Sequence, residues 1–217
     1  MKYIDNYINN YINLYKYIEP LNDDEPDAER RYTISKLYKF LERYINASFI
    51  EIDRINESNN MLDKISNKHI TNNKDKKVIT TLFCDSHFLI ISLEKCYQLI
   101  IELFNLLDEI NKSNEIRSSS NFIKVKRMRN SIEHMNENLL DDKIKSQKYF
   151  DFNTIGHNWL SSQLSTISDN SITIKDYTLN LSQESLDILL LYYSTINDII
   201  NTKYVIPNKE LVDKLFR

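Results

Sequence analysis

Apolar residues recur at intervals of three and four along most of this chain, which is the spacing of one face of a helix. The first stripe predicts an N-terminal helix within residues 1–20, ended by Pro20. A second helix is predicted from Pro26 to about residue 58. The polar residues 59–77 are expected to form a loop. The inward face of the second helix is expected to comprise Ile34, Leu37, Tyr38, Leu41, Tyr44, Ile45, Phe49 and Ile52.

The most apolar segment predicts a helix from residue 78 to about residue 110. It is hydrophobic almost all round, which is typical of a central, buried helix. His87 lies near its start, and we expect a partly buried histidine with a satisfied hydrogen bond. One polar strip crosses the helix and is expected to face solvent: Glu94, Gln98, Glu102, Asn105 and Glu109.

A polar joint from Lys112 to Ser120 leads to a helix predicted at 120–140, the motif helix. Because the joint is short, we expect the motif helix to run antiparallel to the 78–110 helix. A reversal at about residue 116 would bring position 131 opposite position 101, near Gln98 and Glu102. The packing seam of the motif helix is expected to be Val125, Met128, Ile132, Met135 and Leu139.

Residues 150–181 alternate β-branched and polar side chains, which predicts a small β-hairpin with a turn at 168–170. Ser182 is then expected to cap a last long helix. Pro207 is expected to begin a short terminal helix. The inward face of the last long helix is expected to comprise Leu186, Leu189, Leu190, Tyr193, Ile196 and Ile200. The whole pattern predicts an all-α fold of one domain, a bundle of about five helices with the hairpin inserted between the motif helix and the last long helix.

Composition removes several classes of function. The only glycine among 217 residues is Gly156, so the chain has no P-loop, dinucleotide fingerprint or kinase glycine loop. No zinc-ligand spacing occurs, and we expect neither a metal nor another cofactor. Cys84 and Cys96 stand about 18 Å apart along one predicted helix, too far for a disulfide, and are expected to be small buried side chains.

The chain has neither an apolar run long enough to cross a membrane nor a signal-peptide pattern at its start. We therefore expect a cytoplasmic protein that makes no use of a membrane. Its net charge of −3 does not indicate a general binder of nucleic acid. The exception is a basic cluster opposed only by Glu115: Lys112, Arg117, Lys124, Lys126, Arg127 and Arg129.

The basic cluster runs into the six residues from Arg129 to His134, Arg-Asn-Ser-Ile-Glu-His. Arginine can hold a phosphate in a bidentate contact, and histidine can transfer a proton near neutral pH. The same spacing also allows an ordinary surface ion pair between Arg129 and Glu133, worth about 0.3–0.5 kcal/mol. Spacing alone favours that ordinary interpretation.

The motif resembles the signature of the HEPN superfamily, in which an arginine is followed after four to six residues by a histidine. A polar residue commonly follows that arginine, as Asn130 follows Arg129 here. The architecture over residues 30–205 is also similar, so the resemblance implies that residues 1–217 form one HEPN-like helical domain. It implies a metal-independent endoribonuclease, a toxin or antiphage-defence effector, that homodimerises with its site at the interface.

The resemblance also implies roles for the motif residues. His134 would be a general base or acid in attack by the ribose 2′-OH. Arg129 would bind the scissile phosphate, and Asn130 would orient His134 or the phosphate. Asn136 stands where one branch of the superfamily has a tyrosine that a partner enzyme modifies, so that control is not expected.

Further basic residues would bind the RNA backbone: Arg127, Lys126 and Lys124. Arg127 also fits the looser spacing to His134, which leaves open whether Arg127 or Arg129 is the main phosphate ligand. A cognate antitoxin or regulator would be a further partner. The alternative is a non-catalytic HEPN-like helical dimer that binds a protein partner as an antitoxin-type or regulatory module.

Overall fold

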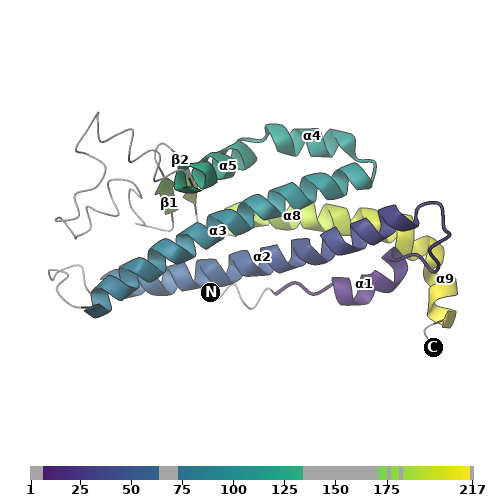
Figure 1. The fold of residues 1–217 in the computed structure, drawn as a ribbon, viewed down its shortest axis with the longest axis horizontal. Coiled ribbons are helices and arrows are strands. Elements are labelled where there is room, and N and C mark those ends of the chain that lie inside the picture. Colours follow the sequence, from purple (N-terminus) through teal and green to yellow (C-terminus); the bar gives the residue numbers. More distant parts are fainter. Residues whose placement is uncertain (1–6, 64–72, 134–170, 175–176, 181–182, 216–217) are drawn as a thin grey trace.

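Two long helices, α2 (Ala28–Asp63) and α3 (Asn73–Leu106), run antiparallel and form the spine of the structure (Figure 1). This computed structural model describes residues 7–63, 73–133, 171–174, 177–180 and 183–215. The predicted helical bundle is confirmed. The other described elements are α1 (Tyr11–Ile18), α4 (Ile110–Ser118), α5 (Ser120–Glu133), β1 (Ser171–Ile174), β2 (Tyr177–Asn180), α8 (Gln183–Ile200), the π-helical turn η2 (Asn201–Val205) and α9 (Ile206–Leu215).

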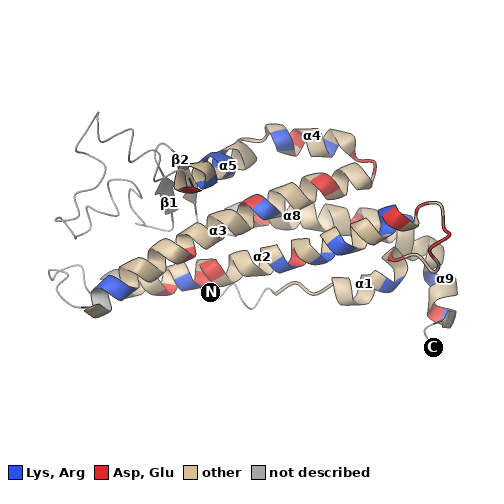
Figure 2. Ribbon diagram, viewed as in Figure 1, with Lys and Arg blue, Asp and Glu red and all other residues tan. Residues whose placement is uncertain are grey.

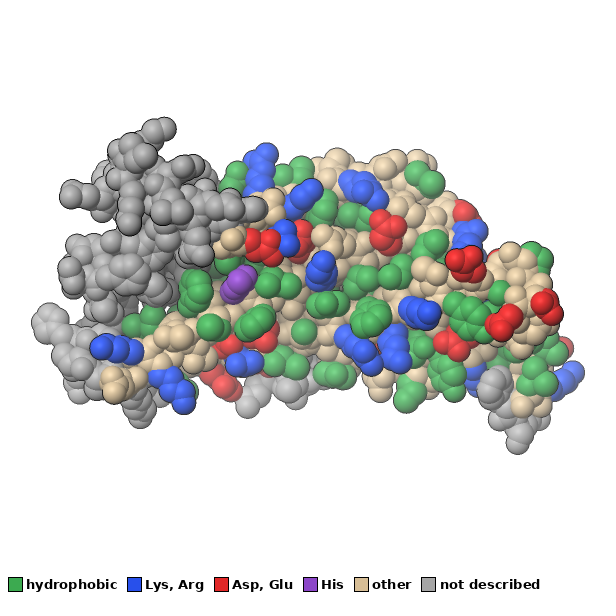
Figure 3. All heavy atoms as spheres, viewed as in Figure 1, with side chains coloured by type: hydrophobic (Ala, Val, Ile, Leu, Met, Phe, Trp, Pro, Cys, Tyr) green, Lys and Arg blue, Asp and Glu red, His purple; other side chains and the backbone are tan. Residues whose placement is uncertain are grey.

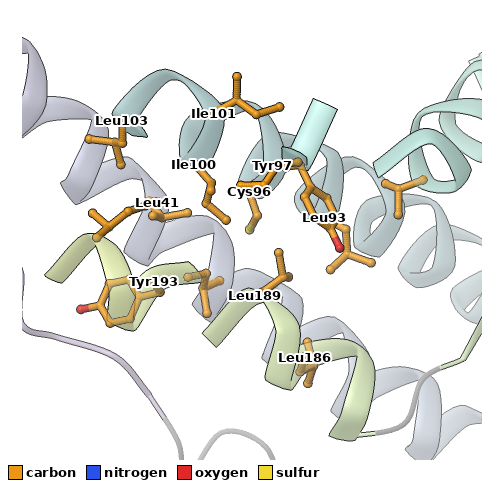
Figure 4. Close-up of a cluster of buried hydrophobic side chains, with 14 of the residues drawn as sticks. Leu41, Leu93, Cys96, Tyr97, Ile100, Ile101, Leu103, Leu186, Leu189 and Tyr193 are labelled. Carbon is orange, nitrogen blue, oxygen red and sulfur yellow. The ribbon is translucent and has the colours of Figure 1, made fainter. Parts of the chain in front are cut away.

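The main core lies where α2, α3 and α8 meet (Figure 4). Leu41 of α2, Ile100 of α3 and Leu189 of α8 are almost completely buried there. Each such side chain stabilises the fold by about 1.5–3 kcal/mol relative to exposure. The predicted inward faces of α2 and α8 are confirmed, since every residue named for them is buried or packs against this core.

The N-terminal helix is shorter than predicted, because residues 7–10 are not helical. Asn46 of α2 explains the difference. Its side-chain amide accepts a hydrogen bond from the N–H of Ile8 and donates one to the carbonyl of Ile8, both at 2.8 Å. These bonds replace those that a helix would make at Ile8. Residues 1–6 lie outside the described part of the chain.

Charged side chains of α2 cap α1 at both ends. The carboxylate of Glu42 accepts hydrogen bonds from the N–H groups of Asn10 and Tyr11, both at 2.9 Å. At the other end, Arg31 donates to the carbonyls of Ile18 (2.8 Å) and Tyr17 (3.1 Å). Both charges have the sign that the helix dipole favours. Because a helix of this length is unstable alone, contacts with α2 determine where α1 forms.

The long helices also differ from the prediction at their ends. Residues 59–63 belong to α2 and residues 73–77 to α3, so the loop predicted at 59–77 is wrong over those residues. Residues 64–72 lie outside the described part. The polar joint predicted from Lys112 to Ser120 is also wrong, because most of it is helix α4. Backbone hydrogen bonds form along α4 although this helix buries only Ser113 and Ile116.

The chain reverses at residues 107–109, directly after α3. Asp108 has a φ of 64°, the left-handed conformation that usually requires glycine but that Asp tolerates. The N–H of Glu109 bonds to the carbonyl of Phe104 (2.8 Å), and that of Asp108 to Asn105 (3.2 Å), which is a Schellman motif. The reversal therefore forms earlier than predicted, in a segment without glycine.

Cations from two other elements stabilise this reversal. Arg30 of α2 donates to the carbonyl of Leu106 at 2.6 Å and forms an ion pair with Asp108 at 2.6 Å. Lys203 of η2 donates to the carbonyl of Leu107 and pairs with Asp108 at 3.2 Å. The C-terminal end of α3 is thus tied to both α2 and η2.

Two short strands pack against α5. β1 and β2 pair antiparallel, with Ser171 opposite Asn180 and Ile174 opposite Tyr177. Ile172 is fully buried, and it belongs to the same core cluster as the apolar face of α5. Most of the segment predicted as a hairpin excursion (150–181), including the turn expected at 168–170, lies outside the described residues.

The C-terminal helix begins at Ile206, one residue before the predicted start at Pro207. Proline has no N–H, so it cannot bond the carbonyl four residues earlier. The π-helical turn η2 precedes it, and the N–H of Ile206 bonds to the carbonyl of Asn201. The chain therefore stays helical from η2 into α9 although Pro207 lacks an N–H.

Both cysteines are free, but only Cys96 is buried, and burial raises the pKa of its thiol to about 12. Cys84 is exposed, so the expectation of two buried cysteines is wrong for it. Among the described residues, no helix combines the length and apolar character that crossing a bilayer requires.

We expect Glu42→Ala to lower the free energy of unfolding by about 3 kcal/mol. The buried carboxylate also accepts the hydroxyl of Tyr193 at 2.7 Å, so its removal leaves that hydroxyl and two backbone N–H groups without their acceptor. Urea unfolding followed by circular dichroism measures the change. The control is Glu57→Ala, an exposed position on the same helix. Equal urea midpoints for the two variants would contradict the prediction.

Candidate functional site

The packing of α5 sets which motif residues face outward. Val125, Met128 and Ile132 are buried, which confirms the predicted seam over the described part of the helix. Arg127 and Asn130 are consequently exposed, and Arg129 is half-buried at the side of the helix. His134, Met135 and Leu139 lie outside the described residues.

Arg129 is held by side chains of two helices. Its Nε lies 3.5 Å from Oε2 of Glu94 on α3, and its Nη2 lies 2.6 Å from Oε2 of Glu133. Its Nη1 donates to Oδ1 of Asn130 at 3.2 Å. The ion pair expected between Arg129 and Glu133 is therefore present, and Asn130 contacts the arginine itself.

Glu94 is the buried partner in this arrangement. Only 5% of its side chain is exposed, so the expectation that this part of the polar strip faces solvent is wrong. Its second oxygen accepts a hydrogen bond from Gln98 at 3.2 Å, and Gln98 accepts one from Lys95 at 3.0 Å. A carboxylate buried this deeply is costly unless it is paired, so Arg129 compensates its charge.

The register between α3 and α5 differs from the predicted one. Arg129 pairs with Glu94, and Arg117 of α4 pairs with Glu102 at 3.5 Å. Position 131 is consequently not opposite position 101, because the chain reverses at 107–109 and not near 116. The predicted antiparallel arrangement holds, and Figure 2 shows charged residues of both signs on the facing stretches of α3 and α5.

Arg127 is directed to a different neighbour. Its Nη1 donates to the hydroxyl of Tyr177 on β2 at 3.0 Å, and its guanidinium lies 5.5 Å from the centre of that ring. Lys124 and Lys126, on the same helix, form no ion pair within the described part of the chain. The two arginines considered as phosphate ligands thus have separate partners, one on α3 and one on the strand pair.

His87 does not behave as expected. Its Nε2 is buried and has no hydrogen-bond partner among the described residues. Its ring lies near those of Phe83 and Phe88, at centroid distances of 6.5 and 6.1 Å. Burial lowers the pKa of His87, and the charge of Glu133 partly opposes that shift. Sequence reasoning missed this neighbourhood because it depends on the register between α3 and α5.

A second polar cluster joins α2 to α3. Arg54 lies 3.1 Å from Asp85 and 3.5 Å from Glu51. Burial raises the pKa of both carboxyl groups, although Arg54 opposes the shift in each. Nowhere in the described ranges do three His, Cys, Asp or Glu side chains gather closely enough to hold a metal ion.

Comparisons with known proteins find no family model, no curated protein and no solved structure that matches this chain. The resemblance to the HEPN superfamily stays a prediction that rests on the residues from Arg129 to His134.

We expect Arg129→Ala to lower the free energy of unfolding by about 2 kcal/mol, because it leaves the buried Glu94 carboxylate without its cation. Adding Glu94→Gln to this variant should recover much of the lost free energy of unfolding, since the neutral amide leaves no unpaired charge in the interior. Arg117→Ala is the matched control. Its partner Glu102 is exposed, so the expected loss is below about 0.5 kcal/mol. Equal losses for the two arginine variants in urea unfolding would refute the special role of Glu94.

We expect Glu51→Gln to become more stable relative to the unchanged protein as the pH rises above 4.5, the ordinary pKa of this group. A raised carboxyl pKa stabilises the fold at low pH, and that contribution is lost as the pH rises through the folded-state value. Glutamine mimics the neutral acid and does not titrate. Urea midpoints measured across pH test this, with exposed Glu57→Gln as control. A pH-independent difference between Glu51→Gln and the unchanged protein would contradict it.

Proposed function

We propose that this chain is a metal-independent endoribonuclease of the HEPN type. The observation that supports this most is the setting of Arg129. A buried carboxylate fixes one side of its guanidinium, while 33% of the side chain remains exposed. Lys124, Lys126 and Arg127 add positive charge along the same helix. This combination suits an arginine that binds a phosphate and is held in position before the phosphate arrives.

In the proposed reaction the ribose 2′-oxygen attacks the scissile phosphorus, and the bond from phosphorus to the 5′-oxygen breaks. The products are a 2′,3′-cyclic phosphate and a 5′-hydroxyl end. His134 serves as a general base or acid for these proton transfers. Arg129 stabilises the charge that builds on the non-bridging oxygens, and Asn130 orients His134 or the phosphate.

Two of the contacts of Arg129 must be exchanged when a phosphate binds. Glu133 is 35% exposed and four residues away on the same helix, so its ion pair is worth only about 0.3–0.5 kcal/mol. Asn130 is exposed as well. The contact with buried Glu94 can remain. A phosphate would thus replace Glu133 as the second anionic partner of Arg129.

The wider proposal follows the resemblance. The protein acts in the cytoplasm as a homodimer whose two motifs meet at the interface, as a toxin or an antiphage-defence effector. A cognate antitoxin or regulator would restrain it. Lys124, Lys126 and Arg127 bind the RNA backbone, with Arg127 as the alternative phosphate ligand.

One observation favours a second candidate function, a non-catalytic helical dimer that binds a protein partner. Every nitrogen of the Arg129 guanidinium already has a partner among the described residues. Such complete pairing also suits an arginine whose role is only structural. This candidate predicts stable association without RNA cleavage.

The deciding experiment is RNA cleavage by the purified protein in EDTA. We expect His134→Ala to reduce the rate by at least about 100-fold. The double variant Arg129→Gln with Glu94→Gln should do the same while keeping the interior neutral. Arg117→Ala is the matched control and should keep the rate. Cleavage at the normal rate by His134→Ala would reject the proposal, and absence of cleavage by the unchanged protein would favour the partner-binding candidate.

Glu133→Gln provides a test in the opposite direction. Removing the carboxylate that competes for Arg129 should lower the RNA concentration needed for half the maximal rate, by about twofold to threefold. Glu115→Gln, an exposed glutamate of α4, is the control. An unchanged or increased KM for Glu133→Gln would show that Glu133 does not compete with RNA.

A further inference from the structure

His87 is a histidine that the sequence motif does not include but that lies beside it in the fold. We propose that His87 is a second proton-transfer residue of the candidate site, the general base that takes the proton of the ribose 2′-OH. This inference rests on the proposed ribonuclease function and names a catalytic residue for it. It is carried by the position of His87, by its uncommitted ring nitrogen and by its surroundings.

The register between the helices brings His87 close to the motif. It precedes Glu94 by seven residues on α3, so both lie on one face, about 10 Å apart along the axis. Arg129 binds Glu94, and α5 runs antiparallel to α3. Glu133 follows Arg129 by one turn of α5, so it lies farther along α3 than Glu94, on the side of His87. The charge of Glu133 acts to raise the pKa of His87, as expected for groups on facing stretches of α5 and α3.

His87 also lies at the surface of the molecule. It is the one histidine among the described residues, and it is the purple side chain in Figure 3, among hydrophobic and charged neighbours. Phe88 next to it is 55% exposed, and its ring is nearly parallel to that of His87.

The ring nitrogen is chemically available. Buried polar atoms in proteins almost always have a hydrogen-bond partner, and a structural histidine would be expected to have one. Nε2 of His87 is buried and has none among the described residues. Nε2 is therefore not committed to a structural hydrogen bond with any described group.

The surroundings favour the neutral ring. Desolvation lowers the pKa of His87, and Glu133 of α5 opposes this shift. The other charged groups nearby are paired, Arg129 with Glu94 and, on the side of α2, Arg54 with Asp85. A neutral imidazole near pH 7 can accept a proton, which is the requirement for a general base.

The 2′-OH proton passes to a ring nitrogen of His87 as the 2′-oxygen bonds to phosphorus. The bond from phosphorus to the 5′-oxygen breaks, and that oxygen takes a proton from a general acid, the role that the proposed function then leaves to His134. Solvent later removes the proton from His87.

The test uses His87→Phe, which keeps an aromatic ring between Phe83 and Phe88 but cannot accept a proton. We expect kcat for RNA cleavage to fall by about 100-fold with KM changed less than about threefold. In a plot of kcat against pH, the residual rate of this variant should no longer fall at acid pH, because in the unchanged protein that fall reflects protonation of His87. Cys84→Ala, exposed one turn earlier on α3, is the control and should keep both the rate and the pH profile.

His87→Gln provides a second measurement if His87→Phe does not fold, judged by circular dichroism. A folded His87 variant with the normal kcat and the normal acid limb would overturn the inference. If the unchanged protein does not cut RNA, both this inference and the proposed function fall. If it cuts RNA, and Arg129→Gln with Glu94→Gln stops cleavage while the His87 variants do not, only the role of His87 is rejected.

Discussion

The antiparallel packing of α2 against α3 is the constraint on which the rest of this structure depends. Apolar side chains of both helices meet those of α8, and the burial of residues such as Leu41 and Ile100 supplies the main stabilisation. Once the pair is fixed, charged residues on its edges position the shorter elements. Glu42 and Arg31 place α1, and Arg30 places the end of α3. The same pair of helices positions the candidate site, because α5 packs on α3.

Charged side chains from neighbouring helices take over the role that glycine has at many helix ends. The chain has a single glycine, at position 156, so the left-handed residue after α3 is Asp108. Arg30 and Lys203 bind both its carboxylate and the carbonyls that the helix leaves open. These bonds link distant parts of the sequence, which makes each helix end dependent on the tertiary fold.

Arg129 illustrates how a structural and a functional role can coincide in one side chain. Glu94 is buried and needs the arginine, whereas Glu133 is exposed and can be exchanged for another anion. A variant that removes Arg129 alone therefore disturbs the interior as well as any phosphate site. Pairing its replacement with Glu94→Gln separates the two effects. His87 belongs to the same neighbourhood although it is far from the motif in sequence.

The sequence by itself determined the helical class, the inward faces of α2 and α8 and the seam of α5, because apolar spacing directly reports which side of a helix is buried. Local patterns could not locate the reversal at Asp108, since it depends on Arg30 and Lys203 from other helices. That reversal sets the register between α3 and α5. Only the tertiary structure could therefore decide that Arg129 meets Glu94, and that the ring of His87 lies near Glu133, because a shift of one helical turn would exchange every partner across the interface.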